Sequence, residues 1–488
     1  MNSKFHATSV LARSAKRLTI QVARLLRDRK ANIAVTFALT MVPAVYLLGM
    51  ALDYAQASRK QSQLNAAIDA AAISAVTPSM LTQPPSVATT TATNVFNATA
   101  TGMPGLSGPP SLSVNITNSG LVRTATVSYT AAATNSFPIL LGAPAWPIKG
   151  SSSASASGAP NINFYLLLDD SPSMGIAGTP SDIATMVNNT PSQEGGCAFA
   201  CHETNPTPSD TAGNPLNSQG KPIDNYTLAR NLGVTLRLDL LVQAVATGTP
   251  NLLDTATQSE AANNNTYKVA IYTFDAGFNT IYAPSGLPST NLAAAKTAAS
   301  SITMPQVYSN NFLTSSNQNN DTDTNFSSAL QSLNTIMPAP GGGTNNVSDT
   351  AQEVVFLVTD GVEDKVVSSK AACAQVTVSM PSSGYRCQQP FDTTWCTTVK
   401  NRGIRIAVLY TEYLPLPTDG WYMTYDGVTG GGIAPFNSPT PSTSPIATNL
   451  QACASPGLFY DVASGGDIKG ALNKLFQLVV ATAAHLTH

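Results

Sequence analysis

Residues 166–175 read "LLLDDSPSMG", an apolar run that ends at two aspartates and continues as Ser-Pro-Ser. Asp, Ser and Pro are also ordinary turn formers, so a turn after a strand would explain this stretch by itself. Similar residues recur later in the chain, however. Asp360 closes a second apolar run, "VVFLVTDG" (354–361), and Thr324 stands in "DTNFSSAL" (323–330), where a helix is expected to begin. Oxygen-bearing side chains at the ends of several predicted elements favour a binding site over a turn.

The chain beyond residue 162 alternates apolar strands with helical patterns. The strands are "FYLLL" (164–168), "YKVAIYTF" (267–274), "EVVFLV" (353–358) and "IRIAVLY" (404–410). Helical patterns occur at 228–245, 291–302, 325–336 and 467–484. Strands without polar alternation are buried on both faces, as in a parallel sheet whose crossovers are helices. We therefore predict an α/β, doubly wound, Rossmann-like domain, interrupted by Pro-, Gly- and Asn-rich insertions near 178–224, 366–391 and 414–446.

Ligands of open α/β sheets bind at the carboxyl ends of the strands, where the apolar runs end here. Asp169, Ser171 and Ser173 are spaced by two, which places their side chains on one side of an extended segment. With Thr324 and Asp360 they offer two carboxylates and three hydroxyls. Oxygen-only ligands suit Mg²⁺, Mn²⁺ or Ca²⁺ better than zinc.

The order of these motifs resembles the von Willebrand factor A domain over about residues 162–485. Its metal-ion-dependent adhesion site, Asp-x-Ser-x-Ser with a later Thr and Asp, matches Asp169, Ser171, Ser173, Thr324 and Asp360. The resemblance implies that the serines bind a divalent cation, Mg²⁺ first, directly and the aspartates largely through water. It also implies an open coordination position for an acidic side chain of a partner protein. The alternative is a degenerate site in which these residues only form turns.

Two aspartates adjoin this pattern without belonging to it. Asp170 and Asp323 are interpreted as solvated turn residues.

Other chemistry has little support in the sequence. A Gly-x-x-x-x-Gly-Lys-Ser/Thr phosphate loop and a Gly-x-Ser-x-Gly nucleophile elbow are both absent. The four histidines leave little for a catalytic base, because His6 precedes the apolar segment at 31–52 and His485 and His488 end the chain. Catalysis is therefore not expected.

The N-terminal region predicts a membrane anchor. "ANIAVTFALTMVPAVYLLGMAL" (31–52) carries no charge, and as a helix it would span roughly 33 Å. That length crosses a bilayer core of about 30 Å. Eight Lys and Arg residues within 1–30 place the N-terminus in the cytoplasm and the rest of the chain outside. A cleaved signal peptide with an Ala-Gln-Ala site at 55–57 is the alternative.

A second resemblance covers residues 27–75. A basic leader, a pilin-like apolar helix and the Asp53-Tyr54 pair after it are similar to TadE/TadG-like proteins of the tight-adherence (Flp) pilus system. Some members of that group carry a von Willebrand A domain outside the membrane. The glycine and glutamate of a prepilin-peptidase site are absent, and Ala31 and Thr36 stand in that region.

These patterns divide the chain into five parts. We expect a basic cytoplasmic leader (1–30), a transmembrane helix (31–52), a stalk helix (53–76), a small β-rich pilin-like module (77–160) and a von Willebrand A domain (161–488).

The resulting functional hypothesis is a single-pass protein of the bacterial inner membrane with its bulk in the periplasm. Its partners would be pilus or secretion-machinery components, and the alternative is a surface adhesin for host or matrix ligands. Nucleic acid is not expected as a partner, because the chain beyond residue 30 carries 26 acidic against 17 basic residues.

Six cysteines all lie on the predicted exported side, which favours disulfides. Six cysteines allow 15 pairings. Proximity in the sequence favours Cys197 with Cys201, Cys373 with Cys387, and Cys396 with Cys453. The motif "CAFACH" (197–202) leaves haem attachment or a zinc site as alternatives, and a redox protein as a third class of function.

Overall fold

The computed structural model forms two compact units, one built around the N-terminal helix and the other from residues 157–483 together with the short segment 119–122. The residues it describes are 29–138, 142–191, 216, 219–263, 265–305, 324–345, 348–373, 376–379, 385–413, 433, 437, 443–463, 465–481 and 484–487.

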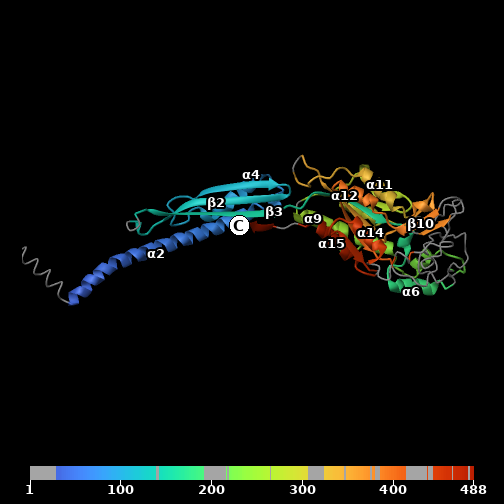
Figure 1. The fold of residues 1–488 in the computed structure, drawn as a ribbon, viewed down its shortest axis with the longest axis horizontal. Helices are drawn as coiled ribbons and strands as arrows, with labels where there is room; N and C mark the ends of the chain where they lie inside the picture. Colours follow the sequence, from blue (N-terminus) through green and yellow to red (C-terminus); the bar gives the residue numbers. More distant parts are fainter. Residues whose placement is uncertain are drawn as a thin grey trace, which may run out of the picture. The chain divides into compact units, whose positions relative to one another are not determined.

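A single long helix, α2 (Arg29–Ser74), runs through Pro43 without a break. Its first half exposes large apolar side chains such as Ile33, Phe37 and Leu48. Within the described residues α2 is the one helix long and apolar enough to cross a membrane, and an 18-residue stretch of it has a mean hydropathy of 2.0. Figure 1 shows this half extending beyond the sheet of its own unit. The predicted membrane segment and stalk therefore form one continuous helix.

The second half of α2 packs against a helix that the sequence did not predict, α4 (Pro85–Ala100), after the short α3 (Pro78–Leu81). Threonines of α4 donate hydrogen bonds to carbonyls one turn earlier, as Thr89 does to Pro85 at 2.9 Å. Threonine has a low helix propensity, so we infer that packing against α2, and not the local sequence, stabilises α4. The contact is made by small residues and one large ring, namely Ala71, Ala72, Ala88, Ala92 and Phe96.

The first unit also contains an antiparallel sheet in the order β1-β2-β3-β13. Its strands are β1 (Ser111–Ser119), β2 (Val122–Thr134), β3 (Ala145–Ser157) and β13 (Ala484–Thr487). The turn between the first two strands contains Gly120, which has a φ of 57°.

The C-terminal strand corrects the expected domain boundary. Residues 484–487 pair antiparallel with β3, so they belong to the first unit and not to the domain predicted at 161–488. The predicted helix at 467–484 correspondingly ends at Val480. The free edge of β3 offers backbone partners that a helix continuing past Val480 could not use.

Asp53, of the Asp-Tyr pair, has a structural role in this unit. It is 2% exposed, and its carboxylate accepts hydrogen bonds from the backbone N–H groups of Ser136 (2.7 Å) and Phe137 (3.1 Å). Asp53 therefore fixes the chain after β2 against α2.

The second unit is built on a six-stranded sheet in the order β12-β11-β7-β4-β5-β6. All neighbours are parallel except β6, which pairs antiparallel with β5. The strands are β4 (Ile162–Asp169), β5 (Tyr267–Phe274), β6 (Phe278–Tyr282), β7 (Gln352–Thr359), β11 (Arg405–Thr411) and β12 (Phe459–Val462). The four predicted strands and the doubly wound α/β class are thus confirmed.

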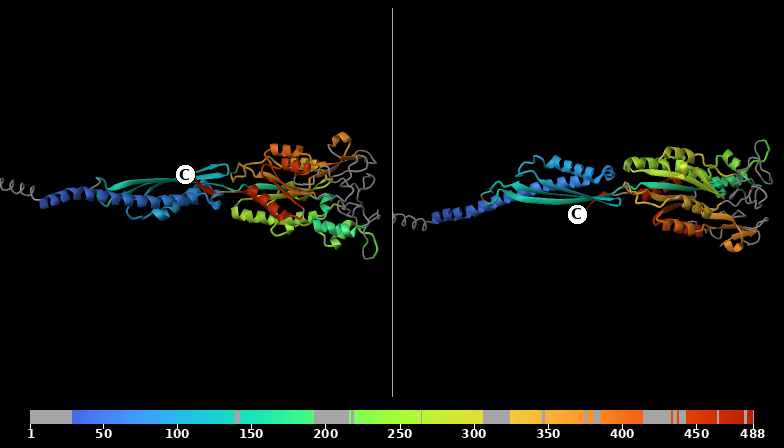
Figure 2. Two further views of the ribbon diagram at one scale, coloured as in Figure 1. Left: turned by 60° about the horizontal axis from the view of Figure 1, so that its bottom comes forward. Right: turned by 90° about the horizontal axis from the view of Figure 1, so that it is seen from above.

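Helices cover both faces of this sheet (Figure 2). One face carries α8 (Arg237–Val242), the π-helical η2 (Gln243–Thr247), α9 (Leu252–Asn263), α10 (Leu292–Ala299) and α15 (Ile468–Val480). The other carries α11 (Phe326–Ile336), α12 (Thr394–Asn401) and α14 (Pro445–Cys453). A smaller cluster joins α6 (Pro180–Asn189) and α7 (Asn225–Asn231). Short 3₁₀ turns are η1 (Pro172–Gly175), η3 (Pro284–Gly286) and η4 (Lys370–Ala372).

A second small sheet, in the order β8-β10-β9, overlaps the predicted insertion near 366–391. Its antiparallel strands are β8 (Val362–Val367), β9 (Val376–Ser379) and β10 (Tyr385–Pro390).

Two of the predicted disulfides are confirmed. Cys373 bonds Cys387 within the insertion, and Cys396 bonds Cys453 between α12 and α14. The predicted pair of Cys197 and Cys201, with the "CAFACH" motif, lies outside the described residues.

A cluster of aromatic rings packs in the core around Phe164 of β4, and truncating Phe164 should lower the stability of the domain. Phe164 lies 5.3 to 5.6 Å, between ring centroids, from Tyr267, Phe356 and Phe476. We expect Phe164→Ala to lower the free energy of unfolding by about 3–5 kcal/mol, through lost burial and the cavity left behind. Chemical denaturation monitored by fluorescence measures this. Leu478→Ala, at a residue of α15 that is 49% exposed, is the control and should change little.

Candidate metal site

The candidate site lies where two neighbouring central strands end. Asp169 is the last residue of β4, and Asp360 directly follows β7, which pairs with β4. Both side chains are fully buried. Parallel strands present their carboxyl ends at the same edge of a sheet, so two carboxylates distant in the sequence meet there.

The segment after β4 folds back on Asp169. The Asp169 Oδ1 atom accepts hydrogen bonds from the Ser171 N–H (3.0 Å) and the Ser171 hydroxyl (2.5 Å). Ser171 and Ser173 share a hydrogen bond of 3.0 Å between their hydroxyls. Ser171 is extended and Ser173 lies in the η1 turn, so the turn, more than the strand spacing, brings the three side chains together.

The second carboxylate lies beside this cluster. Asp360 is close enough to Ser173 for the serine side chain to lower the pKa of the Asp360 carboxyl, and the Asp360 Oδ1 accepts from the Val362 N–H at 3.4 Å. Thr359, which the sequence analysis did not select, donates its hydroxyl to Asp169 Oδ2 at 2.5 Å. Its position directly before Asp360 at the strand end was the available signal.

The electrostatics of the two carboxylates favour a cation. Burial, together with the nearby Asp360, raises the pKa of Asp169 to about 8. Burial also raises the pKa of Asp360. Two desolvated carboxylates in one place disfavour ionisation unless positive charge is supplied.

One positive charge is already present on the protein. Arg237, at the start of α8, is 3% exposed, and its Nη1 lies 3.4 Å from Asp360 Oδ2. Its Nη2 donates to the Glu412 carbonyl at 3.2 Å, and the guanidinium lies 4.8 Å from the Tyr413 ring centroid. Arg237 was not predicted as a site residue; it is one of two arginines, with Arg230, in the apolar helical pattern at 228–245.

Thr324 is anchored at the same end of the sheet by its backbone. It exchanges two backbone hydrogen bonds with Asp364 of β8, of 2.9 and 3.1 Å, and the next residue, Asn325, donates to the Asp275 carbonyl at 2.8 Å. Of the five predicted ligands, all described, Asp169, Ser171 and Ser173 are joined by side-chain hydrogen bonds, and Asp360 lies beside Ser173. No hydrogen bond joins the Thr324 hydroxyl to those four described residues.

Asp170 is not a solvated turn residue, and that interpretation is wrong. It is 7% exposed, its N–H donates to the Phe274 carbonyl at 3.3 Å, and burial raises the pKa of its carboxyl group to about 7. The end of β5, which pairs with β4, lies beside it, and the local sequence did not reveal this contact. Asp323 lies outside the described residues.

The donor set fits a hard divalent cation. Within the described part of the chain, no three His, Cys, Asp or Glu side chains form a metal-binding group. A cation at Asp169 and Asp360 would therefore depend on serine and threonine hydroxyls and on water. Such oxygen ligands are those of Mg²⁺, Mn²⁺ or Ca²⁺, not of a structural zinc.

Comparison with known proteins locates the clearest relationship in α2. Residues 31–77 match the family described as Flp pilus-assembly TadE/G-like. The N-terminal segment is TadE/G-like. The match spans the apolar half of α2, the Asp-Tyr pair and the rest of the helix, so the TadE/G-like segment includes the packing surface of the first unit. No curated protein matches the chain.

Solved structures similar to the chain include a pilus adhesin and von Willebrand A proteins. SpaC, the pilus adhesin of Lactobacillus rhamnosus GG, is 13% identical with a TM-score of 0.32, over 78% of this chain and 35% of SpaC. A von Willebrand factor type A protein of Catenulispora acidiphila is 11% identical, with a TM-score of 0.28, over 78% and 50%. Manganese-loaded TRAP of Plasmodium vivax is 11% identical, with a TM-score of 0.26, over 69% and 81%.

These likenesses are too distant to assign a function. The chain spans between 35% and 48% of the length of the first three structures that it matches.

Proposed function

We propose that this protein is anchored in the bacterial inner membrane by its TadE/G-like helix and binds a partner protein of the pilus-assembly machinery through a divalent cation in its C-terminal domain. The observation that carries the proposal is the pair of fully buried carboxylates, Asp169 and Asp360, which meet at the ends of neighbouring strands beside the hydroxyls of Ser171 and Ser173. Burying two carboxylates close together costs free energy, and a bound cation would offset that cost. This supports a cation-binding role for the pair.

Each residue of the candidate site has a distinct part in this role. Asp169, Ser171, Ser173 and Asp360 would hold the cation, which supplies an open coordination position for a carboxylate oxygen of the partner. Thr359 orients Asp169 through the bond to Oδ2. Thr324 would be added from the chain segment that pairs with β8. The role is one of binding, and catalysis has no part in it.

The proposed topology rests on charge and redox chemistry. The basic residues of 1–30 would remain in the cytoplasm, and the two units would lie in the periplasm. Disulfides in the second unit agree with an oxidising compartment. The preferred cation is Mg²⁺, with Mn²⁺ or Ca²⁺ as alternatives.

Affinity purification from native membranes tests the function. The full-length protein is compared with Asp169→Asn, and co-purified proteins are identified by mass spectrometry with Mg²⁺ present and after EDTA treatment. We expect pilus-assembly components with the unmodified protein in Mg²⁺, and their loss in the variant and after EDTA. Asp254→Asn, in α9 away from the site, is the control and should keep them.

Two outcomes would contradict the proposal. If Asp169→Asn retains the same partners, binding depends on another surface, such as the first unit. If antibodies against residues beyond 160 label intact cells and the retained partners are host or matrix proteins, the chain acts as a surface adhesin instead.

A further inference from the structure

Arg237 brings a fixed positive charge to a site that otherwise holds only carboxylates and hydroxyls. The guanidinium is buried and lies 3.4 Å from Asp360 Oδ2, the carboxylate oxygen that does not accept the Val362 N–H. A buried arginine without a carboxylate partner would be strongly unfavourable, so the two groups stabilise one another.

The backbone holds Arg237 in this position. The segment before α8 pairs with the segment after η1, because the Gly178 N–H donates to the Thr235 carbonyl at 2.7 Å and the Arg237 N–H donates to the Ile176 carbonyl at 3.0 Å. Arg237 is therefore joined directly to the chain that carries Ser171 and Ser173. Stacking on Tyr413 and the bond to the Glu412 carbonyl fix the far side of the guanidinium.

The charges explain what such an arginine does. When both carboxylates are ionised they carry two negative charges, and Arg237 cancels one of these. A divalent cation would then leave the site with one net positive charge, which a single carboxylate of a partner would neutralise. The arginine thus lowers the affinity of the site for the cation and increases the affinity of the cation-loaded site for an acidic ligand.

We propose that Arg237 is a built-in counter-ion of the Asp169–Asp360 pair: it keeps the domain folded without metal, weakens divalent-cation binding, and favours cation retention when an acidic side chain of the partner is bound. The inference rests on the proposed cation site. Arg237 is a positioning residue, since it acts on the cation through Asp360.

The test measures Mn²⁺ binding and thermal stability of the full-length protein in detergent. Arg237→Met keeps the length of the side chain and removes its charge. We expect Mn²⁺ affinity, by calorimetry, to rise at least about tenfold, as for removal of a like charge a few ångströms away. In EDTA the second unit should melt at a lower temperature than in the unmodified protein, and Mn²⁺ should restore it. Damage to the structure alone would lower the affinity.

Two further variants separate charge from packing. Arg230→Met is the matched control, because Arg230 also lies over a tyrosine ring, at 4.7 Å from the Tyr226 centroid, and also pairs with an aspartate, Asp239, but outside the site. It should leave Mn²⁺ affinity unchanged. Adding Asp360→Asn to Arg237→Met removes both opposed charges and should recover the melting temperature in EDTA.

The outcomes distinguish failure of this inference from failure of the site. If the unmodified protein binds Mn²⁺ and Arg237→Met binds it equally or more weakly, the counter-ion role is wrong while the cation site stands. If the double variant melts no higher in EDTA than Arg237→Met, the role is also wrong. If neither the unmodified protein nor Arg237→Met binds Mn²⁺, both the site and the proposed effect of Arg237 on it are overturned.

Discussion

Asp169→Asn is expected to abolish the response of the C-terminal domain to divalent cations without unfolding it. The asparagine oxygen can still accept from the Ser171 N–H and hydroxyl, and its amide can donate to the Thr359 hydroxyl, so the local hydrogen bonds survive. What disappears is one of two buried negative charges. Cation affinity falls steeply with the number of ligand charges, and we expect a loss of about 100-fold or more.

The melting temperature should also show the loss of cation binding. A cation present at a hundred times its dissociation constant stabilises the folded protein by about 2.7 kcal/mol. The unmodified protein should therefore melt at a higher temperature in Mg²⁺ or Mn²⁺ than in EDTA, and Asp169→Asn should melt equally in both. In EDTA the variant should be at least as stable as the unmodified protein, because a neutral asparagine avoids both the burial of a charge and the repulsion by Asp360, the two effects that raise the pKa of Asp169.

Differential scanning calorimetry of the full-length protein with and without Mn²⁺ measures both effects. Asp254→Asn removes a carboxylate whose side chain is 43% exposed, and it should retain the cation response. A marked loss of stability of Asp169→Asn in EDTA would show that Asp169 is a structural acceptor. The five predicted oxygen ligands would then have only a structural role, in forming turns.

Loss of the disulfide between Cys396 and Cys453 is expected to lower the stability of the second unit strongly. The two cysteines are 57 residues apart and fully buried, and they join α12 to α14 on one face of the sheet. Closing a loop of that length stabilises the folded state by about 4 kcal/mol in the chain-entropy model. The double variant Cys396→Ala, Cys453→Ala should therefore unfold at a much lower denaturant concentration.

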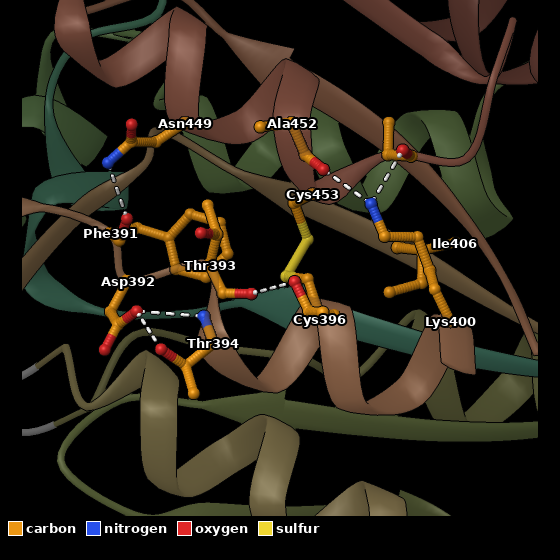
Figure 3. Close-up of a disulfide and its surroundings, with 12 residues drawn as sticks. Phe391, Asp392, Thr393, Thr394, Cys396, Lys400, Ile406, Asn449, Ala452 and Cys453 are labelled. Carbon is orange, nitrogen blue, oxygen red and sulfur yellow. Dashed lines mark hydrogen bonds between the residues drawn. A yellow bond between two sulfur atoms is a disulfide. The ribbon is translucent and has the colours of Figure 1, made fainter. Parts of the chain in front are cut away.

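Figure 3 shows that hydrogen bonds reinforce the same junction. The Lys400 ammonium of α12 donates to the Ala452 carbonyl at 2.5 Å, and the Asn449 amide of α14 donates to the Phe391 carbonyl at 2.9 Å. These contacts should hold the helices near each other after the bond is removed. The variant is accordingly expected to fold at low temperature and to lose stability, not to lose its fold.

The second disulfide provides the comparison. Cys373 and Cys387 are 14 residues apart and lie in the β8–β10 insertion, beside the six-stranded sheet. Their replacement by alanine should cost less, because the insertion can lose order locally while the sheet remains. Urea unfolding of both double variants, oxidised and reduced, measures the difference. Equal losses would mean that the insertion unfolds together with the core.

The fold was largely predictable because its signals are local. Apolar runs such as 353–358 identify strands buried on both faces, and the charge-free segment 31–52 identifies the long helix. By contrast, α4 was not predictable, because its threonines disfavour a helix and only packing against α2 stabilises it. The C-terminal strand was missed for a similar reason, since four residues form a strand only where β3 offers them an edge.

The candidate site also has a part that was predictable from local sequence and a part that was not. The sequence by itself determined that Asp169, Ser171, Ser173 and Asp360 stand at the ends of strands, because the boundary of an apolar run is visible in the residues that form it. Only the tertiary structure decided that Arg237 reaches Asp360, that Thr359 holds Asp169 and that Asp170 is buried. Those contacts join segments far apart in the chain, and their energies arise when helices and strand ends dock, which no local pattern encodes.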